Sequence, residues 1–248
     1  MDHIPLPLLL DGATGSELLR RGMPAGVCTE RWVLEHPQVL QDLQRAYVEA
    51  GSHVVLAPTF GANAARLEAQ GVFGQVASYN RRLVELSRQA VAGKALVAGD
   101  LGPIGQAIPP FGDVSFELLV AIYTEQAAAL ELAGVDLFVI ETAVTMPEAR
   151  AAMLAVRSVS NKPVLVSFTC DEDGRTPSGT DVLAALIVMQ GMGASAFGLN
   201  CGAGPEAILE QLRRLTPYAT IPLLAKPSAG LPTMEGGEAQ YPCTPEEL

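Results

Sequence analysis

The segment VDLFVIETAVTMPEARAAM, residues 135–153, contains the repeating unit that decides the fold. Its first part is a run of apolar residues that ends in the polar pair Glu141 and Thr142. Its second part has the pattern of a helix, and Pro147 stands where a first helical turn tolerates a missing N–H. A strand that is apolar throughout, followed at once by a helix, predicts one step of a parallel sheet covered by helices.

The same step recurs along the whole chain. The other apolar runs that end in polar, Gly or Pro residues are 6–12, 52–60, 94–102, 163–171, 194–202 and 221–230. The predicted helices are 37–50, 75–92, 115–133, 147–158, 181–192 and 205–216. Seven regular steps in 248 residues favour a (β/α)8 TIM barrel, which typically has about 250 residues. We therefore expect one α/β domain over residues 1–248, with the eighth β/α unit missing or truncated.

A doubly wound nucleotide-binding sheet is the alternative, and it should open with a phosphate-binding loop. The segment DGATGSELL, residues 11–19, follows the first run but is neither GxGxxG nor a Walker sequence. The segment GDLGPIGQ, residues 99–106, has three glycines but no helix at the required distance. The barrel is therefore the favoured prediction.

Composition excludes several classes of protein. The net charge of −11 argues against a nucleic-acid or anionic-membrane partner, because both need a basic surface. No apolar run approaches the roughly 20 residues that span a bilayer, and the first residues lack the features of a signal peptide. Four cysteines without CxxC spacing are typical of free thiols in a reducing compartment. These features predict a cytoplasmic protein.

The polar residues that end the predicted strands are the strongest indication of a site. They are Asp11, Thr59, Asp100, Glu141, Thr142, Thr169, Asn200, Cys201 and Lys226. In a parallel barrel the carboxyl ends of the strands form one rim, where active sites are built. Carboxylates on this rim favour a ligand with a cationic group, and backbone N–H groups in the glycine turns after Asp11 and Cys201 favour an anionic one. The pattern predicts a small ligand that carries both charges, as an amino acid does.

Eight segments, in this order, carry a resemblance to a known family. They are LLLDGATGSEL (8–18), LAPTFGAN (56–63), AGDLGPIG (98–105), ETAVTMPEARAA (141–152), SFTCDEDGRTPSGTD (167–181), GLNCGAGPE (198–206), AKPSAGLP (225–232) and YPCTPEEL (241–248). Together they resemble the homocysteine S-methyltransferase family, and most closely the homocysteine-binding barrel of cobalamin-dependent methionine synthases. The resemblance implies a TIM barrel in which zinc holds the thiolate of L-homocysteine for attack on a methyl donor, giving methionine.

The resemblance also assigns roles to residues. It implies that Asp11 and Glu141 hold the homocysteine ammonium. It places Gly12, Ala13 and Thr59 at the homocysteine carboxylate. Cys201 matches a zinc-ligating cysteine, and Asn200 is the amide beside it.

The implied chemistry suits a zinc–thiolate site. A free thiol with a pKa near 8.5 is only partly ionised at neutral pH, whereas zinc deprotonates a coordinated thiol. A catalytic zinc site has three protein ligands and one open position. The family supplies the other two ligands as an adjacent cysteine pair, which this sequence lacks. We therefore expect that pair beyond Leu248, and a chain over 1–248 without stoichiometric zinc or activity. Cys28, Cys170 and Cys243 are predicted to be ordinary thiols.

Two other functions remain open at this point. The same rim would serve a metal-free barrel that binds an amino acid or a partner without turnover. A metal-independent enzyme could use Lys226 to form a Schiff base, although an ion-paired or snorkelling lysine is the favoured interpretation. The methyl donor is left open among a methylcorrinoid protein, methyltetrahydrofolate acting through such a protein, and S-methylmethionine. A donor domain or corrinoid protein is the predicted partner.

Overall fold

The computed structural model describes residues 7–202, 204–230, 233–235 and 238–244 of the chain. The chain divides into two compact units, each of which is described by itself. The first unit comprises Met1–Val139 and Ala151–Pro163, and the second comprises Ile140–Arg150 and Val164–Leu248.

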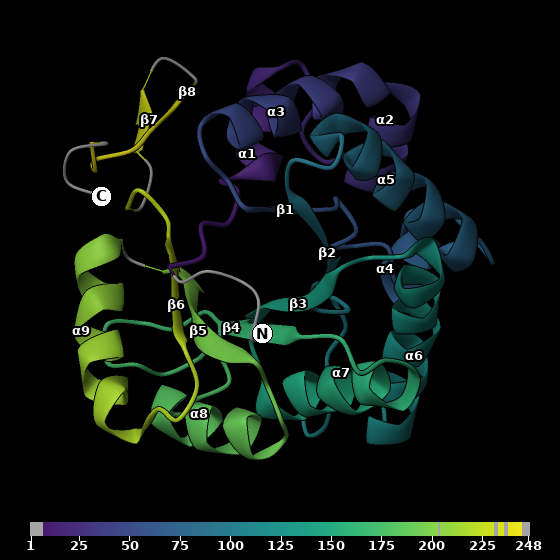
Figure 1. Cartoon of the computed structure of the whole chain (residues 1–248). Coiled ribbons are helices and arrows are strands. Elements are labelled where there is room, and N and C mark those ends of the chain that lie inside the picture. Colours follow the sequence, from purple (N-terminus) through teal and green to yellow (C-terminus); the bar gives the residue numbers. More distant parts are fainter. Residues whose placement is uncertain (1–6, 203, 231–232, 236–237, 245–248) are drawn as a thin grey trace. The chain divides into compact units, whose positions relative to one another are not determined.

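The larger sheet of the described chain contains six strands. They are β1 (Val54–Leu56), β2 (Leu96–Leu101), β3 (Leu137–Ala143), β4 (Val164–Phe168), β5 (Ala196–Cys201) and β6 (Leu223–Pro227) (Figure 1). They are joined in sequence order, and the pairs β1–β2, β4–β5 and β5–β6 are parallel. A doubly wound sheet would instead reverse its strand order at a switch point. The α/β class with parallel strands in sequence order is therefore confirmed, while eight barrel units stay a prediction.

Two of the predicted strands keep three residues or fewer of their apolar runs. The run at 6–12 forms a single parallel bridge between Leu10 and Val54, next to which the Asp11 N–H donates to the Val54 carbonyl at 2.9 Å. The run at 52–60 yields only β1. Pro58 follows closely and, having no backbone N–H, cannot continue a sheet ladder.

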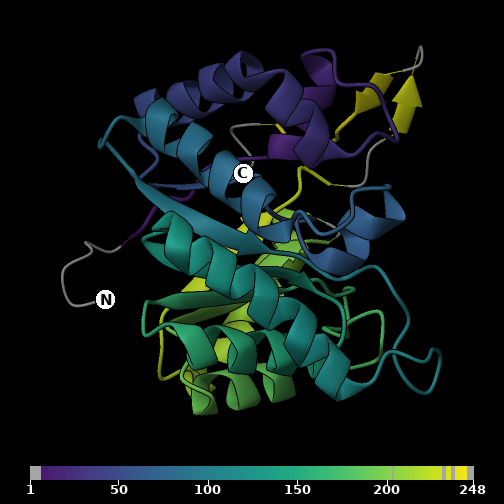
Figure 2. The same cartoon turned by 90° about the vertical axis from the view of Figure 1, so that its right-hand side faces the viewer.

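The first unit buries apolar side chains between its helices and strands. Its helices are α1 (Thr14–Arg20), α2 (Thr29–Glu35), α3 (Pro37–Glu49), α4 (Ala64–Ala69), α5 (Val76–Val91) and α6 (Phe116–Ala133). Figure 2 shows α5 and α6 side by side, and α5 also packs against α3. Helix α6 is capped at its start by Ser115, whose hydroxyl accepts from the Leu118 N–H, and at its end by Gly134 in the left-handed conformation.

The second unit is built on β4, β5 and β6. Helices α8 (Val182–Gly191) and α9 (Pro205–Leu215) pack against each other, α8 contacts β5, and α9 contacts both β5 and β6 (Figure 1). A short helix η1 (Thr216–Tyr218) follows, and strands β7 (Thr233–Glu235) and β8 (Glu238–Gln240) pair antiparallel. Helix α7 (Met146–Val159), like β3, contains residues of both units.

The six predicted helices are confirmed to within one residue at each end. Helices α1, α2 and α4 were not predicted, because each is only six or seven residues long and gives little periodicity. They still contribute to the core: Leu18 of α1 and Val33 of α2 are fully buried in one apolar cluster. Among the described helices, none is both long and apolar enough to cross a membrane.

Candidate functional site

The first unit contains the predicted residues Asp11, Gly12, Ala13 and Thr59. Asp11 is buried, and its carboxylate accepts a hydrogen bond from the Leu56 N–H at 3.0 Å, which fixes it beside β1. Gly12 lies against the ring of Tyr47, so closely that a Cβ at this position would stand 2.9 Å from it. The Tyr47 hydroxyl donates to the Ala13 carbonyl at 3.0 Å. A side chain at position 12 would therefore have to displace the Tyr47 ring.

Thr59 is fully buried and holds the start of the loop after β1. Its hydroxyl donates to the Asp100 carbonyl at 2.9 Å and accepts from the Asp100 N–H at 3.0 Å. Its own carbonyl accepts from the side chain of Gln126 at 2.7 Å. These bonds tie the ends of β1 and β2 to helix α6. Its predicted contact with a substrate carboxylate stays a prediction.

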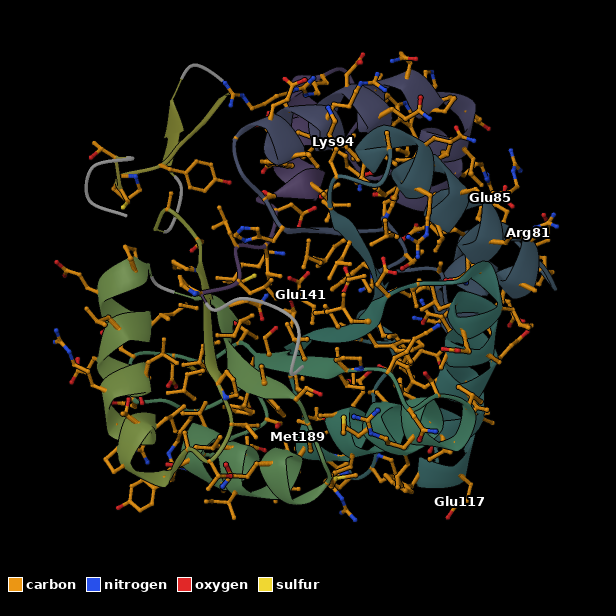
Figure 3. The ribbon with its side chains drawn as sticks, in the orientation of Figure 1. Arg81, Glu85, Lys94, Glu117, Glu141 and Met189 are labelled. Carbon is orange, nitrogen blue, oxygen red and sulfur yellow. The ribbon has the colours of Figure 1, made fainter. Side chains whose placement is uncertain are left out.

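The second unit contains Glu141, Asn200 and Cys201 at the ends of β3 and β5. Glu141 forms an ion pair with Lys226 of β6, with 2.7 Å between Oε1 and Nζ. The two side chains are only 14% and 23% exposed, so this pair is much drier than an ordinary surface pair. Figure 3 labels Glu141 on its strand. The ion-paired interpretation of Lys226 is confirmed.

Asn200 links the ends of β3 and β5. Its side-chain oxygen accepts from the Thr142 N–H at 3.2 Å, and its amide nitrogen donates to the Thr142 hydroxyl at 2.7 Å. The same nitrogen lies 3.2 Å from the Cys201 sulfur. Asn200 is 2% exposed, so these contacts are protected from water. One buried amide therefore positions both the thiol and the residue after Glu141.

The backbone at both ends of this link is unusual. Thr142 has a φ of 58° and Cys201 a φ of 60°, in the left-handed region that residues with a side chain rarely adopt. For the β-branched Thr142 this conformation costs free energy and has to be enforced by its surroundings. The Asn200 bonds and the Ser228 N–H, which donates to the Cys201 carbonyl at 3.2 Å, supply that enforcement. Such strain is concentrated at functional sites.

The two thiols near the strand ends differ in their surroundings. Partial burial raises the pKa of the Cys201 thiol and the nearby Glu141 carboxylate raises it further, while Thr142, Lys226 and Asn200 act in the opposite direction. Burial raises the pKa of Cys170 to about 11, with Asp171 adding to the effect. Both thiols are therefore protonated at neutral pH unless another group ionises them. Only Cys201 is exposed.

A metal requires more ligands than Cys201. Among the described residues there is no group of three or more His, Cys, Asp and Glu side chains that could hold an ion. Zinc sites use three or four protein ligands. The described side chains therefore do not fit a complete zinc site, and Cys201 stands as a single candidate ligand.

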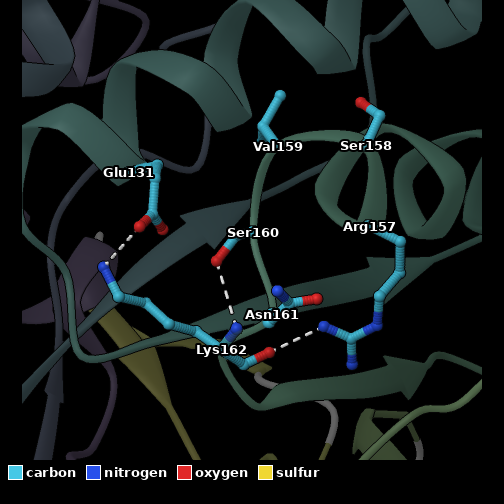
Figure 4. A pocket seen from close by; sticks show the side chains of 7 residues that line it. All are labelled: Glu131, Arg157, Ser158, Val159, Ser160, Asn161 and Lys162. Carbon is cyan, nitrogen blue, oxygen red and sulfur yellow. Dashed lines mark hydrogen bonds and ion pairs between the residues drawn. The ribbon is translucent and has the colours of Figure 1, made fainter.

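A polar pocket of the first unit is lined by none of the predicted site residues. It is lined by Glu131, Arg157, Ser158, Val159, Ser160, Asn161 and Lys162 (Figure 4). The Lys162 ammonium pairs with Glu131 at 2.9 Å, and Arg157 donates to the Lys162 carbonyl at 2.7 Å. Because these charged groups already bond to each other and to the backbone, we interpret the pocket as part of a solvated loop and not as a binding site.

Two functional candidates were found from sequence as polar ends of apolar runs but were given no substrate- or metal-binding role. They are Thr142 and Lys226. Their partners could not be read from the chain, because Thr142 pairs with a residue 58 positions away and Lys226 with one 85 positions away.

Comparison with known proteins places the chain in a family. The profile of the homocysteine S-methyltransferase family matches residues 8–248. This protein belongs to the homocysteine S-methyltransferase family.

Curated relatives include two methionine synthases. The one from Mycobacterium leprae is 31% identical over 257 aligned positions, which cover 96% of this chain and 21% of that protein. The one from Mycobacterium tuberculosis is 30% identical with the same coverage. The chain therefore spans about a fifth of the length of these relatives.

The fold is similar to that of solved family members. The homocysteine methyltransferase MmuM from Escherichia coli, in its metallated form, matches with a TM-score of 0.79 and 26% identity over 90% of this chain and 84% of that one. Its oxidized form matches with a TM-score of 0.77. The likeness extends over nearly all of the present chain.

Proposed function

We propose that this protein takes part in methyl transfer to the thiolate of L-homocysteine, giving methionine. Membership of the family supports this reaction. The observation that supports particular residues is the cluster of Glu141, Thr142, Asn200 and Cys201 in the second unit. In it a buried amide joins Thr142 to an exposed thiol on a strained backbone, and the neighbouring Glu141 carboxylate is ion-paired with Lys226.

Glu141 is proposed to bind the substrate ammonium. A half-buried carboxylate forms a charge-assisted hydrogen bond that is about twice as strong as a neutral one. Its bond to the Lys226 ammonium indicates that the position accepts a primary ammonium group. In the first unit, taken by itself, Asp11 is proposed as a further candidate to bind a substrate ammonium, with its carboxylate oriented by the Leu56 N–H.

The substrate carboxylate is proposed to bind at the turn of Gly12 and Ala13. The Tyr47 ring and hydroxyl hold this turn in place, so its backbone would need no rearrangement on binding. For Thr59 we propose an indirect part: its hydroxyl is bonded to the Asp100 backbone, so it acts through the loop that it holds.

Cys201 is proposed as one zinc ligand, with the remaining ligands outside the described residues. Zinc, when bound, would ionise the substrate thiol and keep it nucleophilic. The part of this chain is to present the Cys201 sulfur, which the Asn200 amide orients by its contact at 3.2 Å. The methyl donor is proposed to be a methylcorrinoid protein or domain, methyltetrahydrofolate acting through it, or S-methylmethionine.

Calorimetry with L-homocysteine tests the substrate role. Glu141→Gln keeps the shape of the side chain but removes its charge, so we expect affinity to fall about ten- to a hundredfold. Glu131→Gln is the matched control, because Glu131 also pairs with a lysine, at 2.9 Å, but lines the polar pocket of the first unit. Equal affinity in wild type and Glu141→Gln would contradict the proposal.

A turnover assay distinguishes an enzyme from a barrel that binds homocysteine without methylating it. Methionine formation is measured by mass spectrometry with each proposed donor in turn. Binding of homocysteine without methionine from any donor would favour the binding protein instead.

A further inference from the structure

The Glu141–Lys226 pair places two opposite charges side by side in the proposed substrate site. Strand pairing aligns Lys226 of β6 with Asn200 of β5, next to Cys201. The ammonium and carboxylate are 2.7 Å apart, with side chains less than a quarter exposed. The carboxylate proposed to hold the substrate amine is therefore already bonded to a cation of the same chain.

We infer that Lys226 is a specificity-determining residue that binds the α-carboxylate of the ligand whose ammonium binds Glu141. This inference rests on the proposed function and adds that the second unit selects α-amino acids over simple amines and simple thiols. On binding, the Lys226–Glu141 bond is exchanged for two bonds, one from Glu141 to the ligand ammonium and one from Lys226 to the ligand carboxylate.

Charge balance favours this exchange over mere competition between Lys226 and the ligand. A ligand with only an ammonium group would displace Lys226 from the Glu141 carboxylate, which lies 2.7 Å from the Lys226 ammonium. Because both side chains are largely buried, separating these two charges is costly. A ligand that brings its own carboxylate offers Lys226 an anion in exchange for Glu141. An α-amino acid carries the two groups on one carbon, at a spacing comparable to that of the pair.

Calorimetry with three ligands tests the inference. They are L-homocysteine, 3-mercaptopropylamine, which lacks the carboxylate, and 4-mercaptobutanoate, which lacks the amine. In Lys226→Met we expect homocysteine affinity to fall about ten- to a hundredfold, and any binding of 4-mercaptobutanoate to be lost. Affinity for 3-mercaptopropylamine should stay the same or rise, because its competitor for Glu141 is gone.

Controls separate binding from folding. Lys162→Met breaks a Lys–Glu pair of similar length in the first unit and should change none of the three affinities. Lys226→Arg keeps the positive charge and should keep most of the homocysteine affinity. If Lys226→Met does not fold, as judged by circular dichroism, Lys226→Gln takes its place with the same expectation.

The outcomes are distinct. If homocysteine binds Lys226→Met as tightly as wild type, or more tightly, Lys226 is only a competitor and the inference is wrong, while the proposed function stands. If wild-type protein binds no homocysteine, the proposed function and this inference fail together. Selective loss of the two carboxylate-bearing ligands supports the inference.

Discussion

The polar strand ends of the two units look alike in sequence but differ in what their side chains bind. In the first unit, Thr59 and Gln126 bond to backbone carbonyl and N–H groups, and their effect is to hold loops. In the second unit, Glu141 bonds to Lys226, and Asn200 contacts both Thr142 and Cys201. Side chains committed to backbone form a scaffold, whereas side chains that bond to one another can exchange partners with a ligand.

Backbone strain also marks the Asn200 link. Of the three non-glycine residues with positive φ in the described part of the chain, Thr142 and Cys201 flank this link in the second unit, and Ala92, which follows α5, lies in the first. Close approaches to glycine occur in both units, as at Gly12 beside Tyr47 and Gly198 beside Leu224. We interpret the first cluster as support and the second as the centre of binding and chemistry.

The largest expected effect comes from the thiols. In the protein with its full zinc-ligand set, Cys201→Ser should lower methionine formation at least about a hundredfold, since even residues that only support a metal ligand cost ten- to a hundredfold when mutated. Cys170→Ser should leave it nearly unchanged, because the half-buried Cys170 thiol, with a pKa of about 11, is protonated at neutral pH. Methionine and zinc are measured together, and loss of both in Cys170→Ser would reverse the assignment.

The second prediction concerns packing in the two units. A Cβ at Gly198 would stand 1.9 Å from the Leu224 carbonyl oxygen, where β5 pairs with β6. A Cβ at Gly102 would stand 2.6 Å from the Phe60 ring, which can turn away. We expect Gly198→Ala to cost more than about 3 kcal/mol of stability and Gly102→Ala about 1–3 kcal/mol.

Urea unfolding followed by circular dichroism measures both changes. Gly191→Ala, at the end of α8 with no heavy atom within 4 Å of the added Cβ, is the control and should be neutral or stabilising by up to about 1 kcal/mol. Equal losses of stability in Gly198→Ala and Gly102→Ala would show that the paired strands β5 and β6 adjust to an added Cβ as easily as the Phe60 ring does.

The sequence predicted the fold class because buried parallel strands read as continuous apolar runs. Both β3 and β5 begin and end inside the predicted runs, and Glu141 and Cys201 fall at their carboxyl ends as expected. The strand order could be predicted because each strand is followed by a helix that returns the chain to the next position.

The internal partners of the site could not be predicted. Thr59 and Glu141 each end an apolar run, and nothing local to either residue indicates that one bonds to backbone and the other to a lysine 85 residues away. Those partners depend on strand register, such as the alignment of Asn200 with Lys226. Roles assigned through the family resemblance likewise stay proposals for Asp11, Gly12, Ala13 and Thr59.

The third prediction tests the scaffold role directly. Thr59→Val keeps the side-chain shape but leaves the Asp100 N–H and carbonyl without their bonds to the Thr59 hydroxyl, at a cost of about 1–3 kcal/mol, or a melting temperature lower by roughly 2–12 °C. Homocysteine affinity should change less than about threefold, within the smallest effects expected for a hydrogen bond. Asn200→Ala should lower stability by a similar amount but also weaken homocysteine binding and methylation. A large affinity loss in Thr59→Val would instead support direct contact with the carboxylate.

The smallest expected effect compares the helix starts of the two units across pH. Asp181 caps α8 through the Leu183 N–H at 2.8 Å and pairs with Arg214 at 2.6 Å, whereas the neutral Ser115 caps α6. Partial burial alone would raise the pKa of Asp181, but the bonds from Arg214 and Leu183 outweigh it and lower this pKa.

A carboxyl whose pKa is lower in the folded than in the unfolded chain adds stability above its unfolded pKa of about 3.9, and that stability is lost as pH falls through the folded value. Asp181→Ala and Ser115→Ala should each cost about 0.5–2 kcal/mol near neutral pH. Between about pH 7 and about pH 3, the cost of Asp181→Ala should shrink as the carboxyl of the wild type takes up its proton, while that of Ser115→Ala should stay constant. Thermal unfolding of both variants beside wild type measures the difference, and parallel pH profiles would show that the charge of Asp181 adds nothing to its cap.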